Sequence, residues 1–371
     1  MLMIDRRYFR YFDWFSFFIT LLLLGLGLLL VFSSTYRVEK PISMFFKKQV
    51  LGALAGLGIY FFFCIKDLRK LARLGFWIYI GVLVLLTVTL VCGKIGMGGQ
   101  RWISLYFIRF QPSELAKLFF PFFIAHFLED LEFVNFTRSR YLPTSQFMVP
   151  LIVLLISFVL IAKQPDLGTA LLILFSGFIT FWFIGINREF FLTLALIGML
   201  GAPFFWNFLK PYQQQRILVL FGYGDARKER YQVEQSKIAI GSGGIVGKGL
   251  LQGTQNKLGF LPEDHTDFIF SVACEEFGFI GAMLILLLFF LMFARIIFII
   301  AHIPPLFEQI IGIGLLIHIL ISVCINLGMV TGILPAVGIP LPLFTSGVSN
   351  LWITLASLGG LNNIAIRRFY Y

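Results

Sequence analysis

An aspartate beside a long apolar stretch is the residue of this chain best suited to acid–base chemistry. His265, Thr266 and Asp267 directly precede the apolar run that follows Phe268. A carboxylate next to apolar surface is costly unless it is paired or hydrated. Thr266 or Asp267 could cap the following helix, or Asp267 could act as a general base that accepts a proton from a hydroxyl group. His265 could orient a substrate or hydrogen-bond its own loop, and the sequence leaves both uses open.

A second polar group surrounds the start of an expected helix. Arg101 and Trp102 precede it, Ser113 follows a proline at its first turn, and Glu114 and Lys117 come next. The i,i+3 spacing of Glu114 and Lys117 places the two charges on one helix face, where they can pair. Such a pair either lets one charged turn enter lipid or faces a water-filled interior and takes part in function.

Two further motifs carry charges in turns. Asp166 follows a proline between two apolar runs, where an aspartate serves as a turn residue as readily as a catalytic group. The glycines of 241–249 surround Lys248, but no strand precedes them and no GxxxxGK[ST] pattern is present, so a nucleotide site is not expected. These glycines favour sharp turns, with Lys248 near lipid headgroups or a pyrophosphate.

The other acids and prolines near Asp267 have structural explanations. If 267–276 were one helix, Glu275 would lie about 12 Å along the axis from Asp267, which is too far for a pair of catalytic carboxylates about 5–9.5 Å apart. We therefore expect Glu275 and Glu276 to be structural. Three prolines within 335–342 interrupt an apolar stretch. Irregular backbone at membrane depth persists where it lines a cavity or is buried in protein, which predicts a cleft beside Asp267.

Composition places these motifs in a membrane protein. Hydrophobic residues make up 58% of the 371 residues and charged residues 13%, whereas soluble domains are about half apolar and a quarter charged. The net charge of +11 lies at span ends and in loops, so anionic lipid headgroups rather than nucleic acid are the expected partner. The four cysteines and four histidines show no disulfide framework and no metal-ligand spacing.

The apolar stretches predict an all-α polytopic protein with about ten transmembrane helices in one integral membrane domain, 1–371. The expected spans are 14–34, 45–65, 75–93, 113–128, 146–163, 168–186, 190–209, 277–300, 310–331 and 347–366. Short segments on the side of the two chain ends hold more Lys and Arg than those on the opposite side, which places both termini in the cytoplasm. The large loop 210–276 between the seventh and eighth spans is then extracytoplasmic, and we expect it to pack back onto the bundle as amphipathic helices.

In this order, the motifs resemble the SEDS family (shape, elongation, division and sporulation) of bacterial cell-wall polymerases, and within it the RodA elongation branch rather than the FtsW division branch. The matching segments are GGQRWI (98–103), FQPSELAK (110–117), QPDLGTA (164–170), PYQQQRI (211–217), QSKIAIGSGG (235–244), GKGLLQGT (247–254), LPEDHTDFIF (261–270), EEFG (275–278) and NLGMVTGILPAVGIPLPL (326–343). The chain departs from the family pattern at 345–350, where it reads TSGVSN in place of the usual SYGGSS.

The resemblance implies an inverting peptidoglycan glycosyltransferase that polymerises lipid II on the outer face of the bacterial cytoplasmic membrane during elongation and shape maintenance. The family's essential acid falls on Asp267. The expected substrate-binding residues are Arg101, Trp102, Glu114, Lys117, Asp166, Arg216, Lys248 and His265. The implied partners are a class B penicillin-binding protein, supplying the transpeptidase, and other membrane proteins of the elongation machinery. A divalent cation, Mg²⁺ or Mn²⁺, is a candidate cofactor with unknown ligands, and no nucleotide is expected.

Three alternatives remain at this point. The chain could move lipid II across the membrane rather than polymerise it, but an external base has no use in a transporter, whose site lies near the midplane. It could belong to the division-type FtsW branch. It could also be a non-catalytic scaffold for a transpeptidase, which would leave the polar cluster unexplained.

Overall fold

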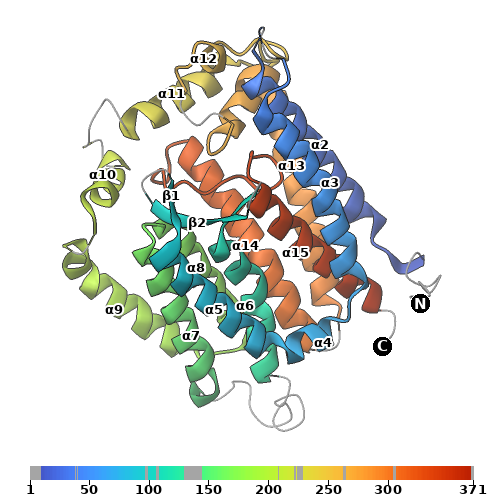
Figure 1. Cartoon of the computed structure of the whole chain (residues 1–371), viewed down its shortest axis with the longest axis vertical. Helices are drawn as coiled ribbons and strands as arrows, with labels where there is room; N and C mark the ends of the chain where they lie inside the picture. Colours follow the sequence, from blue (N-terminus) through green and yellow to red (C-terminus); the bar gives the residue numbers. More distant parts are fainter. Residues whose placement is uncertain are drawn as a thin grey trace.

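The computed structural model describes residues 10–37, 39, 41–96, 99–105, 108–128, 144–207, 209–220, 223, 229–261, 265–303 and 306–368. Long helices run side by side through most of the molecule (Figure 1). The shorter helices α11 (Glu229–Ser242) and α12 (Thr254–Lys257) lie at the top of that view. The basic residues Arg6, Arg7, Arg138 and Arg140, which contributed to the predicted orientation, lie outside the described residues.

Long apolar helices carry the fold. Within the described part of the chain, six of them are long and apolar enough to cross a membrane: α2 (Trp14–Thr35), α3 (Met44–Ile65), α5 (Gly75–Cys92), α8 (Leu167–Ile184), α13 (Ile269–Ala301) and α14 (Leu306–Val330). The other predicted spans fall on α6 (Pro112–Leu128), α7 (Thr144–Lys163), α9 (Arg188–Trp206) and α15 (Val348–Arg367). The expected multi-pass helical architecture is therefore correct, while the number of ten spans stays a prediction. The remaining helices are α4 (Leu68–Arg73), α10 (Pro211–Leu220), α11 (Glu229–Ser242) and α12 (Thr254–Lys257).

A small antiparallel sheet corrects the expectation of an all-α chain. Its strands are β1 (Lys94–Gly96), β2 (Gly99–Leu105) and β3 (Ile108–Phe110), in the order β1-β2-β3. Trp102 of β2 pairs with Lys94, and Ile103 pairs with Phe110. β1 and β3 have three residues each, too few to show a period-two pattern, and β2 (GQRWISL) does not alternate strictly between apolar and polar residues, so no strand was predicted. The sheet holds Arg101 and Trp102 in extended backbone beside the start of α6.

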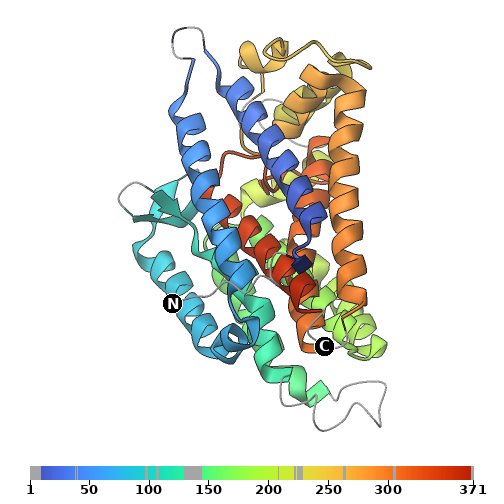
Figure 2. The same cartoon turned by 90° about the vertical axis from the view of Figure 1, so that its right-hand side faces the viewer.

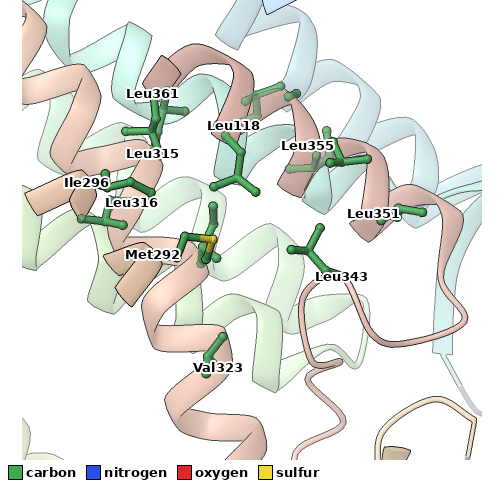
Figure 3. Close-up of a cluster of buried hydrophobic side chains, with 14 of the residues drawn as sticks. Leu118, Met292, Ile296, Leu315, Leu316, Val323, Leu343, Leu351, Leu355 and Leu361 are labelled. Atoms are coloured by element: carbon green, nitrogen blue, oxygen red, sulfur yellow. The ribbon is translucent and has the colours of Figure 1, made fainter. Parts of the chain in front are cut away.

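The hydrophobic core lies where α6, α13, α14 and α15 meet (Figure 3). Fully or almost fully buried side chains from all four helices contact one another there, including Leu118, Met292, Leu315 and Leu355. Leu343, from the proline-containing segment, joins the same cluster. The irregular segment after α14 is thus anchored in the core rather than lying loose at the surface.

The loop predicted over 210–276 forms short helices and packs onto the bundle, as expected. Ser236 of α11 hydrogen-bonds the Ser271 hydroxyl (2.7 Å) and the Val330 carbonyl (2.6 Å), which ties α11 to α13 and α14. Figure 2 shows α11 and α12 at the end of the bundle away from the chain termini. Helix α13 already begins at Ile269, ahead of the eighth span predicted from 277. Its backbone is non-helical at Gly278, where the apolar part of the sequence begins.

Candidate functional site

Asp267 lies in a turn that directly precedes α13. The N-cap of this helix is Phe268, which makes no side-chain cap hydrogen bond. The assigned cap position is therefore the residue after Asp267, and capping by Thr266 or Asp267 stays one of the explanations that the sequence left open. Asp267 is half-buried.

Asn326 holds the main chain of this turn. It is completely buried in α14, and its Nδ2 donates to the carbonyl of Asp267 (2.9 Å) and to the carbonyl of Ile339 (2.8 Å). One amide group thus joins the turn before α13 to the segment 331–347. Sequence analysis did not select Asn326, although an amide within an apolar helix is a signal of a bound polar partner.

Gly338 lies against the carboxylate of Asp267. Its φ is +75°, a conformation that L side chains rarely adopt. A Cβ added there would lie 3.3 Å from Oδ2 of Asp267. The absence of a side chain at 338 therefore keeps space beside the carboxylate. The proline-containing segment thus lies next to Asp267, and the cleft expected there stays a prediction.

His265 fixes the other side of the turn. Its carbonyl accepts a hydrogen bond from the Ser346 amide (3.0 Å), and its ring packs on Phe45 of α3 with 4.7 Å between centroids. The segment 345–350, where the chain departs from the family pattern, thus begins in direct contact with the Asp267 turn. The two roles left open for His265 remain compatible with this arrangement.

Arg101 reaches from β2 to the turn between α7 and α8. Its Nε donates to the Gln164 carbonyl (3.3 Å), its Nη2 to the Pro165 carbonyl, and its Nη1 lies 3.7 Å from the Asp166 carboxylate. The guanidinium is a quarter exposed. Trp102, the next residue, is half-buried in the same strand.

Asp166 has an architectural role that the sequence had left undecided. Its Oδ1 accepts from the Thr169 amide (3.3 Å) as the N-cap of α8, and its Oδ2 accepts from Nε2 of Gln111 (2.7 Å). Only 4% of the residue is exposed. The carboxylate therefore organises the turn that positions Arg101, whatever further contact a substrate makes.

A small cavity joins these elements. Arg101 and Arg216 line it, and the Pro335–Val337 stretch closes one side. The cavity measures about 30 Å³. Gly168, at the start of α8, is also in contact, because a Cβ there would lie 2.8 Å from the Val337 carbonyl. Val337 lines this cavity and the adjacent Gly338 touches Asp267, so one short segment separates two guanidinium groups from the carboxylate.

Glu114 and Lys117 form the buried pair that their spacing predicted. The Lys117 Nζ lies 2.7 Å from each oxygen of the Glu114 carboxylate, and both side chains are 5% exposed. At this burial each charge needs the other to offset its loss of hydration. Neither side chain lines the Arg101–Arg216 cavity.

Lys248 is engaged by a buried acid. Its Nζ lies 2.6 Å from Oε1 of Glu275 and donates to the hydroxyls of Ser242 and Thr254, both at 2.8 Å. The same carboxylate oxygen accepts from the Thr254 and Gln255 amides at 2.7 and 3.1 Å. This arrangement agrees with the structural role expected for Glu275. It also places the Lys248 amine on protein rather than leaving it open to a pyrophosphate.

The glycines around Lys248 permit close backbone approach. A Cβ at Gly243 would overlap the Cys274 carbonyl, and one at Gly247 would overlap the Glu276 carbonyl. At Gly278 the φ of +65° breaks α13 and frees the amides of Phe279 and Ile280, which donate to carbonyls of the glycine-rich loop. The loop is thus a packing element, as the absence of a nucleotide motif predicted.

Within the described part of the chain, no three His, Cys, Asp or Glu side chains come together as a metal-binding cluster. Mg²⁺ sites commonly use one or two carboxylates plus substrate phosphates, so this observation does not decide metal dependence. The divalent cation stays a prediction.

Comparison with known proteins places the chain among cell-wall proteins. It is 38% identical over 295 residues to the peptidoglycan glycosyltransferase MrdB of Escherichia coli K12, covering 79% of this chain and 78% of the relative. A structure of the Thermus thermophilus rod shape determining protein RodA superposes with a TM-score of 0.70 at 27% identity, covering 96% of this chain and 98% of that one. A chain from a peptidoglycan synthase complex, described for its coordination of polymerization and crosslinking, gives 0.81 at 28% identity over 97% and 99%.

A family model described as "Cell cycle protein" for FtsW, RodA and SpoVE matches residues 14–369. The matched region includes every site residue discussed above. Together with six apolar helices long enough to cross a membrane, the match makes this a multi-pass membrane protein. The chain therefore belongs to the FtsW/RodA/SpoVE family, the SEDS family that its motifs predicted, and its similarity to RodA supports the elongation branch.

Proposed function

We infer that this chain is a peptidoglycan glycosyltransferase that polymerises lipid II, the undecaprenyl-pyrophosphate-linked disaccharide-pentapeptide, with Asp267 as the general base. Family membership and the similarity to a named peptidoglycan glycosyltransferase support the activity. The substrate and the role of each residue are our proposals. We place the reaction on the extracytoplasmic side, with both chain ends in the cytoplasm.

The reaction requires one positioned base. The sugar is α-linked to pyrophosphate in lipid II and becomes β-1,4-linked in the glycan, so the configuration at the reacting carbon inverts. The incoming 4-hydroxyl loses its proton to the base as its oxygen bonds to the anomeric carbon. The bond from that carbon to the pyrophosphate oxygen breaks at the same time, and the pyrophosphate leaves with the electron pair. No enzyme nucleophile is needed, and one carboxylate suffices.

One observation carries the assignment. The segment 335–338 borders both groups, because Pro335 and Val337 line the cavity that Arg101 and Arg216 also line, and a Cβ at Gly338 would lie 3.3 Å from Oδ2 of Asp267. A base on one side and two guanidinium groups on the other match the separation of charge in the reaction, because the proton departs at one end and negative charge develops on the leaving group at the other. Preorganised cations stabilise that developing charge.

Substrate binding has to widen the cavity. A volume of about 30 Å³ has room for little more than a water molecule, whose share of liquid volume is about 30 Å³. A pyrophosphate therefore enters only when α10, which carries Arg216, and the Pro335–Val337 stretch separate. A divalent cation, if used, would be held by oxygens of the substrate's pyrophosphate and would supply further charge neutralisation there.

The proposed activity also implies protein partners. A solved relative forms part of a peptidoglycan synthase complex that couples polymerization and crosslinking. We propose that this chain likewise associates with a class B penicillin-binding protein, whose transpeptidase crosslinks the strands it makes. Other elongation-machinery membrane proteins complete the proposed set.

The test compares two aspartate-to-asparagine variants in a polymerisation assay with labelled lipid II and the cognate transpeptidase. Asp267→Asn keeps the shape of the side chain but cannot accept the proton, so the rate should fall roughly 10²–10⁴-fold. Asp67→Asn is the matched control, because Asp67 caps α4 (Leu68–Arg73) and asparagine is an equally good cap. Near-normal polymerisation by folded Asp267→Asn would exclude the mechanism, and loss of lipid II translocation in the same variant would favour a transporter.

The orientation has its own measurement. In a cysteine-free background, cysteine at Tyr223, whose side chain is 69% exposed, should react with a membrane-impermeant thiol reagent applied to spheroplasts. Reaction only after lysis would reverse the proposed orientation.

A further inference from the structure

A second cavity lies where the described part of the chain begins and ends. Its volume is about 180 Å³, and it opens between the start of α2, the last turns of α13 and the end of α15. Arg10, Arg295 and Arg368 contribute three guanidinium groups to its lining, and Asp13 contributes one carboxylate. The lining therefore carries an excess of positive charge far from the Asp267 site.

The carboxylate of Asp13 is already engaged. Its Oδ1 accepts from Nε and Nη2 of Arg295 at 3.2 and 3.0 Å, and its Oδ2 accepts from the Ser16 hydroxyl at 2.5 Å. Asp13 is 6% exposed, so it is a buried anchor for Arg295. The Nη1 of Arg295 donates no hydrogen bond within the described residues. It can therefore donate to a ligand while Asp13 fixes the rest of the guanidinium group.

The cavity lies at the level expected for lipid headgroups. Trp14 begins α2 and is 44% exposed, and Phe15 and Phe18 follow it at 49% and 55%. Exposed aromatic side chains at the end of an apolar helix mark the membrane–water interface. The adjoining α13 and α15 end at Ala301 and Arg367, within a few residues of the cavity lining.

We propose that this cavity binds the phosphate of an anionic phospholipid headgroup through Arg10, Arg295 and Arg368. Guanidinium groups bind phosphate oxygens in pairs of parallel hydrogen bonds. Basic pockets between membrane helices are sites for anionic headgroups. The volume is below the roughly 300–1,000 Å³ of sites that enclose a small molecule, so it suits a phosphate whose glycerol and acyl chains stay in the membrane.

The proposal predicts lipid-selective stabilisation of the protein. The full chain, purified in an uncharged detergent, is titrated with short-chain phosphatidylglycerol, with phosphatidylcholine of the same chain length and with inorganic phosphate. A ligand that binds only the folded state raises the midpoint of thermal unfolding. Phosphatidylglycerol should raise it saturably, and the other two should not, because choline cancels the headgroup charge and free phosphate lacks the anchoring chains.

Variants locate the binding site. Removing each arginine should raise the half-saturating lipid concentration about fivefold. The double variant Arg10→Gln with Arg368→Gln should therefore raise it about 25-fold. The corresponding Lys variants retain charge and should recover part of the affinity, which separates binding from misfolding. Arg188→Gln is the matched control, because Arg188 is an exposed arginine at the start of α9 and outside the cavity.

Three results would overturn the proposal. Wild-type lipid affinity in the double variant would show that Arg10 and Arg368 do not bind the lipid. An equal loss in Arg188→Gln would show that general charge attraction suffices. An equal shift with inorganic phosphate would assign the cavity to a soluble anion instead of a lipid.

Discussion

Asp267 and Glu275 lie close together in the sequence and at the same end of the bundle, but their surroundings are opposite. Oε1 of Glu275 accepts from Lys248 and from two main-chain amides, and the residue is completely buried. Asp267 is half-buried, and a glycine lies beside its carboxylate. Oε1 of Glu275 ties the loop to α13 through these donors, whereas Asp267 borders the segment that also lines the Arg101–Arg216 cavity and is our proposed base. The difference is one of environment, since both are acids near the start of one helix.

Of the variants compared here, those of the Glu114–Lys117 pair should have the largest effect on stability. Lys117→Met leaves the Glu114 charge buried without its partner, which should lower the free energy of unfolding by about 3 kcal/mol. Adding Glu114→Gln should recover part of that loss, as measured by denaturation in detergent. Strictly additive losses in the double-mutant cycle would contradict the pairing.

Glu275→Gln should show the reverse pattern to Asp267→Asn. The neutral side chain keeps the shape but weakens the hydrogen bonds of Lys248 and the two amides, which should cost about 2 kcal/mol of unfolding free energy. Polymerisation per folded molecule should stay near the wild-type rate. A rate loss as large as that of Asp267→Asn would mean that the two acids act together and would remove the distinction drawn here.

Gly338→Ala should affect both stability and rate. The added methyl group is strained at a φ of +75° and would lie 3.3 Å from the Asp267 carboxylate. We expect about 1 kcal/mol of destabilisation and a rate roughly tenfold lower, because small displacements of reacting groups have large kinetic effects. Gly332→Ala is the control, since that glycine has the same φ but lies against Lys237. Equal rate losses in both variants would attribute the effect to loop strain alone.

Asp166→Asn should have the smallest effect. Asparagine still accepts from the Thr169 amide as an N-cap, so the unfolding free energy should change by less than about 1 kcal/mol. The weaker attraction for Arg101 should raise the KM for lipid II more than it lowers kcat. A loss of kcat comparable to that of Asp267→Asn would make Asp166 a direct participant in the reaction.

Sequence analysis predicted the features that depend on local pattern. The apolar runs located the long helices, and the i,i+3 spacing predicted the Glu114–Lys117 pair that the structure contains. The proline-containing segment was expected to border a cleft, and Pro335 does line the Arg101–Arg216 cavity. These features need only periodicity, spacing and the constraints of backbone hydrogen bonding.

The features that sequence analysis missed depend on contacts between distant segments. The interactions of Lys248 with Glu275 and of Asn326 with Asp267 join residues whose separation carries no periodic signal. The turns of α13 before its break at Gly278 carry Glu275 and Glu276, so the apolar pattern located only the part of the helix after the break. Glu275 is accommodated there because Lys248 and the Thr254 and Gln255 amides donate to it. The strands were missed because β1 and β3 have only three residues each and β2 lacks strict alternation.

The hydrogen bonds of Asn326 join residues that are synthesised at different times. Asn326 follows Asp267 by 59 residues, and Ile339 follows Asn326 by 13. The ribosome therefore makes the carboxylate well before the amide that holds its turn, and before the glycine that lies beside it. A chain that stops ahead of residue 338 carries the proposed base without its surroundings. Competence for the reaction thus arises only as the last membrane helices are completed, after the greater part of the protein has already entered the membrane.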